Sequence, residues 1–265
     1  MPAAHRNTRT ERYIYNLGEA TMTTGNAGTR LDEIANGIYR ISTRLDVVPG
    51  GFTFNSFLVT GDEPLLFHTG YRKLFPVIRE AIEKAMPIEK LRWIGGSHFE
   101  SDEFGALNDL LAVAPNATPF GSEIGVLTSL DDFASRPARG LADGEEFSIG
   151  GRRMKWMYTP HVPHGWDCGV LFDVSSKTLF SGDLFTQAGA DLPPVTESEV
   201  LTASEGMRRA MDYYAHATNT SVILDRLAKL EPSLLACQHG SAYRGDGAAL
   251  IRELAATLGK EKGIV

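Results

Sequence analysis

The sequence predicts an α/β fold in which two mixed β-sheets pack together with helices on their outer faces. Short apolar segments typical of strands recur before and after the helical stretches, and many are joined by turns short enough for hairpins. This order favours two mixed sheets over a single parallel sheet. Four of the predicted strands also end in loops that carry histidine or carboxylate side chains.

The composition is that of a folded protein and argues against several kinds of partner. Of the 265 residues, 43% are hydrophobic and 22% are charged, which suits one large core and argues against disorder. The net charge of -7 argues against nucleic acid or an anionic membrane as a partner. The two cysteines fit neither a disulfide framework nor a metal motif, and we see no membrane-spanning segment or secretory signal. We therefore expect a cytoplasmic protein.

In chain order, an N-terminal extension is expected at residues 1–35 and a single domain at 36–265. A helix is expected at 75–85, because apolar residues recur on one face and Pro87 follows its end. The apolar run 91–94 is interpreted as the end of a buried strand, which Gly95 and Gly96 break into a loop. The other elements expected in this half are strands at 38–43, 54–60 and 65–68 and helices at 106–114 and 126–133.

The second half repeats the alternation of hairpins and helices. Residues 201–230 are strongly helical and are expected to form two helices broken near 216–220, and 247–260 is expected to close the chain as a helix. The prolines and the glycine of 159–165 make that segment a loop. The strands expected here are 146–149, 154–158, 169–174, 178–181 and 234–237.

The loop after residues 91–94 concentrates metal-binding side chains. His98, Glu100 and Asp102 alternate, so an extended backbone would direct all three toward one point. The loop lies at the carboxyl edge of a sheet, where α/β folds commonly bind ligands. Carboxylates that converge repel each other unless a cation lies between them, so the pattern predicts a metal site.

Three other loops present a similar residue directly after an apolar strand. These residues are His164, with His161 nearby, Asp183 and His239. A lone histidine after a strand is more often a structural hydrogen-bonding residue than a ligand. Four such loops, one of them with several donors, favour a metal site built from separate strand ends.

The motifs resemble those of the metallo-β-lactamase fold, an αββα sandwich, and within it the flavodiiron proteins and their single-domain oxygen-binding relatives. The resemblance covers roughly residues 36–250. Zinc hydrolases of this superfamily carry a histidine where this chain has Glu100, and the glutamate is typical of the diiron branch. The motifs that carry the resemblance are His98-x-Glu100-x-Asp102, His164-Gly165-Trp166-Asp167-Cys168, Phe180-Ser181-Gly182-Asp183 and Cys237-Gln238-His239-Gly240.

The resemblance implies a two-metal site. Metal one would be held by His98, Glu100 and His164, metal two by Asp102 and His239, and Asp183 would bridge them. Oxygen and imidazole donors suit iron, with zinc, manganese or a mixed pair as alternatives.

The implied function is that of a non-haem diiron protein that binds or activates dioxygen, as a sensor or as an oxidase or reductase. The alternative is a dinuclear metallohydrolase acting on an ester, lactone, thioester or phosphoester. Flavodiiron proteins normally carry a flavodoxin-like FMN domain, and we expect none in these 265 residues. A separate electron donor or a signalling protein is therefore an expected partner. Homo-oligomers are also expected, because they are frequent in this fold.

Four further residues have roles that the sequence leaves open. Glu103 stands where the family often has a histidine, and either binds metal or caps the next helix. His68 replaces an aspartate that often supports the site, and either supports the ligands or reaches the metals. His164 is preferred over His161 because it lies 19 positions before Asp183, the family spacing, which leaves His161 a supporting or pocket residue. Asp167 is expected to orient an imidazole.

Overall fold

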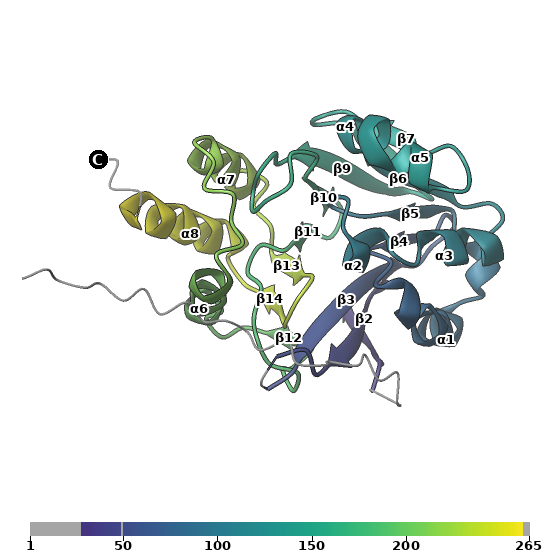
Figure 1. The fold of residues 1–265 in the computed structure, drawn as a ribbon, viewed down its shortest axis with the longest axis horizontal. Helices are drawn as coiled ribbons and strands as arrows, with labels where there is room; N and C mark the ends of the chain where they lie inside the picture. Colours follow the sequence, from purple (N-terminus) through teal and green to yellow (C-terminus); the bar gives the residue numbers. More distant parts are fainter. Residues whose placement is uncertain (1–27, 49, 262–265) are drawn as a thin grey trace, which may run out of the picture.

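The computed structural model of the protein describes residues 28–48 and 50–261. Two seven-stranded mixed sheets pack face to face, and helices cover their outer faces (Figure 1). The predicted fold class is therefore confirmed. Most of the expected N-terminal extension, residues 1–27, lies outside the described residues.

The first sheet changes from antiparallel to parallel along its width. Its order is β1-β2-β3-β4-β5-β6-β7, with antiparallel pairing from β1 to β4 and parallel pairing from β4 to β7. The parallel half places the carboxyl ends of β4, β5 and β6 at one edge. The strands are β1 Arg30–Ala35, β2 Ile38–Leu45, β3 Phe52–Val59, β4 Leu65–Phe67, β5 Trp93–Gly95, β6 Thr118–Ser122 and β7 Arg139–Leu141.

The second sheet has the order β12-β14-β13-β11-β10-β9-β8. Its central strands β11 and β13 are parallel, although 51 residues separate the end of one from the start of the other in sequence, so their carboxyl ends lie side by side. The strands are β8 Glu146–Ile149, β9 Arg152–Tyr158, β10 Gly169–Asp173, β11 Thr178–Gly182, β12 Val195–Thr196, β13 Leu234–Cys237 and β14 Ala242–Arg244.

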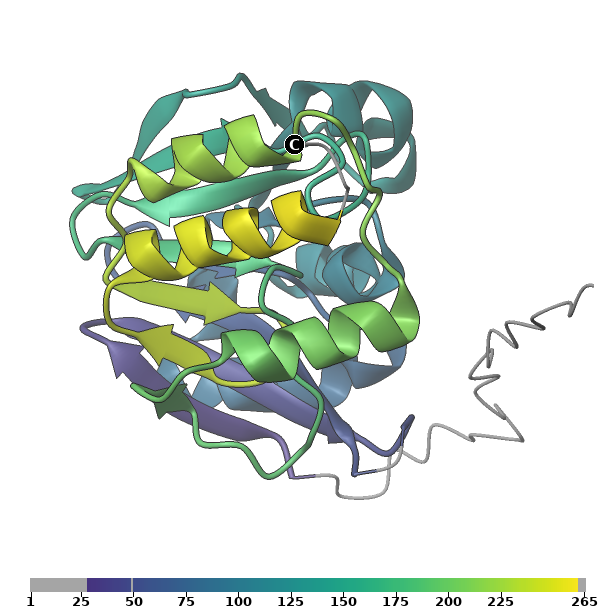
Figure 2. The same ribbon diagram turned by 90° about the vertical axis from the view of Figure 1, so that its left-hand side faces the viewer.

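Helices pack on the outer face of each sheet, and aromatic rings fill the space between the sheets. Helices α6, α7 and α8 lie along the second sheet (Figure 2), whereas α1 and α3 pack on the first. Phe57, Phe67, Phe120, Trp156 and Phe180 are fully buried between the sheets. The longer helices are α1 Phe75–Ala85, α3 Leu107–Val113, α6 Leu201–Met211, α7 Thr220–Ala228 and α8 Gly247–Glu261.

Short helical segments complete the connections. They are η1 Arg72–Leu74, η2 Ile88–Lys90, α2 Ser101–Phe104, α4 Glu123–Gly125, the π-helical turn η3 Val126–Leu130 and α5 Asp131–Phe133. The helix expected at 126–133 is therefore a π-helical turn followed by a single helical turn. In the described part of the chain no helix is both long and apolar enough to cross a membrane.

The predicted long helices and central strands are confirmed, and the strands that were missed lie mostly at sheet edges. Residues 30–35, read as part of the extension, form the edge strand β1, whose sequence Arg-Leu-Asp-Glu-Ile-Ala carries three charges. Strands β7, β12 and β14 are two or three residues long and show no periodicity. They form because a neighbouring strand supplies the partner.

Candidate metal centre

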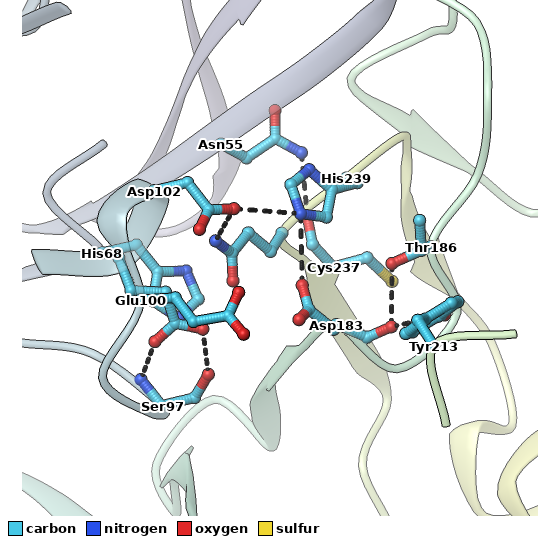
Figure 3. A network of polar contacts seen from close by, with 12 residues as sticks. Asn55, His68, Ser97, Glu100, Asp102, Asp183, Thr186, Tyr213, Cys237 and His239 are labelled. Carbon is cyan, nitrogen blue, oxygen red and sulfur yellow. Dashed lines mark hydrogen bonds and ion pairs between the residues drawn. The ribbon is translucent and has the colours of Figure 1, made fainter. Parts of the chain in front are cut away.

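The predicted ligand residues meet where the ends of strands from both sheets come together. His98 follows β5 of the first sheet, whereas His164, Asp183 and His239 come from the second sheet, after β9, β11 and β13. Figure 3 shows Glu100, Asp102, Asp183 and His239 turned toward one another. Loops that lie far apart in the sequence therefore present their side chains to a shared space.

One group of four donors is compact enough for a single ion. His98, Glu100, His164 and Asp183 each offer an atom within 4.8 Å of the others. Glu100 Oε1 lies 3.3 Å from His98 Nε2 and 3.2 Å from His164 Nε2. His164 Nε2 also lies 3.3 Å from Asp183 Oδ2. These are the residues that the family resemblance assigned to metal one, together with the bridging Asp183.

The second group shares Asp183 with the first. His239 Nε2 lies 3.1 Å from Asp183 Oδ1 and 3.5 Å from Asp102 Oδ2. The two oxygens of Asp183 thus face different groups, Oδ2 toward His98 and His164 and Oδ1 toward His239. A carboxylate in this position has the geometry to bind two ions at once.

The donor set fits metal ions better than it fits hydrogen bonding within the protein. His98 is only 4% exposed, and its Nε2 makes no hydrogen bond within residues 28–48 and 50–261, although Glu100 Oε1 is close. Imidazole nitrogens and carboxylate oxygens are ligands for iron, zinc and manganese. The cluster is therefore a buried His/Glu/Asp metal-binding site.

The pKa values of these groups are shifted because several carboxylates lie close together around the histidines. The close approach of the His164 and His98 rings, 3.2 and 3.3 Å from Glu100 Oε1, holds the pKa of Glu100 well below its usual range. Burial lowers the pKa of His239, but Asp102 and Asp183 outweigh this effect and raise the pKa to about 10. Without metal, His239 holds a proton at neutral pH that partly balances the carboxylates. Metal binding must release this proton, so metal affinity should fall as pH falls.

Strand β3 fixes the orientation of His239 from the opposite sheet. The Nδ1 of His239 donates to the Thr53 carbonyl at 2.9 Å, which leaves Nε2 facing the carboxylates. Thr53 Oγ1 accepts from the N–H of Gly240, and Asn55 Nδ2 donates to the carbonyl of Gly240. Asn55 Nδ2 also donates to the carbonyl of Cys237 (Figure 3). This support was not predicted from the sequence. The signal available was the presence of polar residues inside an otherwise apolar buried strand.

The main chain at Asp183 is held in a similar way. Its carbonyl accepts hydrogen bonds from Thr186 Oγ1 at 2.8 Å and from the Tyr213 hydroxyl at 3.1 Å (Figure 3). Tyr213 follows the end of α6 and lines the cavity beside the donors.

The side chains of the first loop converge through a backbone conformation that the sequence did not predict. An extended segment was expected to align His98, Glu100 and Asp102, but residues 101–104 form helix α2. Glu100 is the extended residue before this helix, and Asp102 lies in its first turn. The convergence therefore depends on one helical turn.

Glu103 and His68 lie beside the donors rather than among them. The Glu103 carboxylate accepts a hydrogen bond from the N–H of His98 at 2.8 Å and lies 2.9 Å from His98 Nδ1. It therefore neither joins the donor group nor caps a following helix. His68 is fully buried, with its Nε2 3.6 Å from Glu103 Oε2.

The remaining two residues do not contact the donors as expected. His161 is exposed and is absent from the described lining of the cavity, whereas His164 lies in the cluster. Asp167 Oδ2 accepts from the main-chain N–H of Phe99 at 2.9 Å. Asp167 was expected to orient an imidazole, and it instead ties the first loop to the loop that carries His164.

A cavity of about 660 Å³ opens next to the donors. Glu100, Asp102, His164, Asp183 and His239 form its polar side. The rest of its wall is mainly apolar and aromatic, from Val47, Val48, Phe52, Phe54, Tyr71, Met207, Met211 and Tyr213. The donors are therefore reached through an apolar space.

Comparison with known proteins gives a family match over most of the chain. Residues 52–240 match the model described as ODP family beta lactamase. A curated relative, the putative diflavin flavoprotein A 2 of Synechocystis, is 26% identical over 199 residues, which is 72% of this chain and 33% of the relative. The chain thus spans about a third of that relative's length.

Solved structures share the fold at low identity. The rubredoxin oxygen:oxidoreductase of Desulfovibrio gigas superposes with a TM-score of 0.72 at 22% identity, over 86% of this chain and 62% of that one. The flavodiiron protein of Giardia intestinalis gives a TM-score of 0.73 at 20% identity, over 88% of this chain and 60% of that one. In both cases the match covers less than two thirds of the other protein.

Proposed function

The chain belongs to the ODP family of β-lactamase domains, and from this membership and its donor set we propose that it is a non-haem diiron protein that binds or activates dioxygen. The observation that carries the proposal is the position of Glu100, whose Oε1 lies within 3.3 Å of both His98 and His164. A carboxylate at this place adds a hard anionic donor and favours iron over a histidine-rich zinc site. The two similar solved structures, named as an oxygen:oxidoreductase and a flavodiiron protein, support the same proposal.

In this proposal six residues of the chain are ligands of two metal ions. His98, Glu100 and His164 would hold metal one, Asp102 and His239 would hold metal two, and Asp183 would be shared between them. Ferrous ions held there would supply electrons and open coordination positions for dioxygen. The wall of the cavity beside these residues is mainly apolar.

Reductive turnover also needs electrons from outside the metal centre. We therefore include in the proposal a separate electron donor, or a signalling protein that responds to the oxygen-bound state. Manganese or a mixed metal pair would use the same donors, and metal analysis distinguishes these cases from iron.

A dinuclear metallohydrolase is the second candidate, and the size of the cavity favours it. A volume of about 660 Å³ is far more than dioxygen needs and falls within the range of about 300–1,000 Å³ typical of sites for organic ligands. In a hydrolase the same residues would hold two ions that polarise an ester, lactone, thioester or phosphoester.

Exposure of the reduced protein to air separates the two candidates. The protein is loaded with ferrous iron without oxygen, and its absorption spectrum is recorded before and after air is admitted. The diiron proposal predicts a new absorption in the visible or near-ultraviolet range that requires both iron and oxygen. A protein that holds zinc, shows no such change and hydrolyses ester or lactone substrates would contradict the proposal.

A further inference from the structure

A buried carboxylate next to the donor cluster contacts one of the donors, His98. Glu103 is fully buried, and its contacts are with the first loop rather than with the space shared by the donors. We propose that Glu103 is a positioning residue that holds His98 in the orientation needed for metal binding. The inference rests on the proposed role of His98 as a ligand of metal one.

Glu103 holds His98 at two places at once. Its Oε2 accepts from the main-chain N–H of His98 at 2.8 Å, and its Oε1 lies 2.9 Å from the Nδ1 of the ring. An imidazole whose Nδ1–H donates to a carboxylate presents Nε2 as its metal-binding atom. The Nε2 of His98 accordingly faces Glu100 and Asp183, at 3.3 and 3.8 Å. Backbone and ring are thus fixed by one group.

The surroundings are built to hold this carboxylate. Both the N–H and the hydroxyl of Ser97 donate to it. Gly96 leaves the space that it occupies, because a Cβ at that position would lie 2.9 Å from Glu103 Oε2. Four donors therefore converge on one buried carboxylate: the N–H groups of Ser97 and His98, the Ser97 hydroxyl and the His98 ring.

The helical turn of α2 explains why the neighbouring acidic residues Asp102 and Glu103 point in different directions. Successive side chains on an α-helix point about 100° apart, since one turn takes 3.6 residues. Asp102 therefore turns toward His239, while Glu103 turns inward to His98. The main-chain carbonyl of Glu103 also accepts from the N–H of Thr69 at 2.6 Å, which anchors the turn to the end of β4.

His68 completes the arrangement from the other side of Glu103. It is fully buried beside the Phe67 ring at a centroid distance of 4.4 Å, and its Nε2 lies 3.6 Å from Glu103 Oε2. His68 thus places a polar ring, and not an aliphatic side chain, against the buried carboxylate of Glu103. We assign His68 as a neighbour of Glu103 and not as a ligand.

The test uses the intact chain loaded with Zn²⁺, a diamagnetic probe that does not depend on which metal the protein holds in cells. In the wild-type protein, nitrogen-15 NMR of the histidine rings should show His98 bound through Nε2, with a protected Nδ1–H. Glu103→Gln should shift or abolish this Nδ1–H signal. It should also weaken the tighter Zn²⁺ site by about 10- to 100-fold, the usual effect of losing a residue that orients a ligand.

Two further variants separate positioning from general stability. Asp173→Asn removes a different fully buried carboxylate, one that pairs with Arg152 at 2.8 Å and accepts from Ser176, and it should leave the Zn²⁺ affinity and the His98 signal unchanged. Glu103→Asp keeps the charge and should recover part of the affinity lost in Glu103→Gln.

Several results would overturn the role of Glu103. These are binding of His98 through Nδ1 in the wild-type protein, an unchanged affinity in a folded Glu103→Gln variant, or an equal loss in Asp173→Asn. The wild-type spectrum decides the question even if Glu103→Gln does not fold. A protein that binds two zinc ions but shows no oxygen chemistry with iron would contradict the proposed function alone.

Discussion

Replacing Asp183 with Asn is expected to lower the metal content from two ions per chain to less than one. The two oxygens of Asp183 face different donor groups, so removing its charge weakens both sites together. The loss of metal affinity should be larger than about 100-fold, the upper end of the effect of losing a residue that only orients a ligand. Metal analysis after dialysis, together with titration of the metal-free protein, measures this effect.

The variant should still fold, because asparagine keeps the size and shape of the aspartate side chain. Thermal unfolding of the metal-free protein should confirm this. Asp102→Asn is the matched comparison, since Asp102 contacts only the His239 side and its loss should leave one ion bound. If Asp183→Asn also retained one fully bound ion, Asp183 would not be a bridge.

Replacing Glu100 with His is expected to abolish the response to dioxygen and to shift the metal content from iron toward zinc. The exchange removes one negative charge between His98 and His164 and leaves a neutral imidazole in its place. Nitrogen-rich sites without that carboxylate suit zinc better than iron. Metal analysis and the air-exposure spectrum of the variant measure the two effects.

A matched control is Glu89→His, which makes the same exchange at an exposed position on η2. This variant should keep both the metal content and the oxygen response of the wild-type protein. An unchanged oxygen response in Glu100→His would show that Glu100 does not set the chemistry of the site, and the assignment of the chain to oxygen chemistry would lose its main support.

Much of the donor set could be predicted because it depends on local signals. His98, His164, Asp183 and His239 each follow an apolar run that ends in a loop, and the parallel pairing of β11 with β13 brings two of these ends together. The choice of His164 over His161 agrees with the structure, in which only His164 joins the cluster.

What could not be predicted depends on contacts between distant segments. Thr53 meets His239 across 186 positions of sequence, and no local pattern shows that β3 supports a loop of the other sheet. The role of Glu103 depends on the helical turn at 101–104, which is too short to leave a periodic signal. The edge strand β1, which pairs with β2, was not predicted because its three charged residues interrupt the apolar pattern typical of a strand.

The metal content of the protein purified without added metal tests the proposed diiron centre most directly. The proposal predicts two iron ions per chain, held by His98, Glu100, Asp102, His164, Asp183 and His239. Two zinc ions per chain, with no iron and no binding of added ferrous iron, would contradict the diiron assignment. A chain that binds no metal under any of these conditions would contradict the metal centre itself.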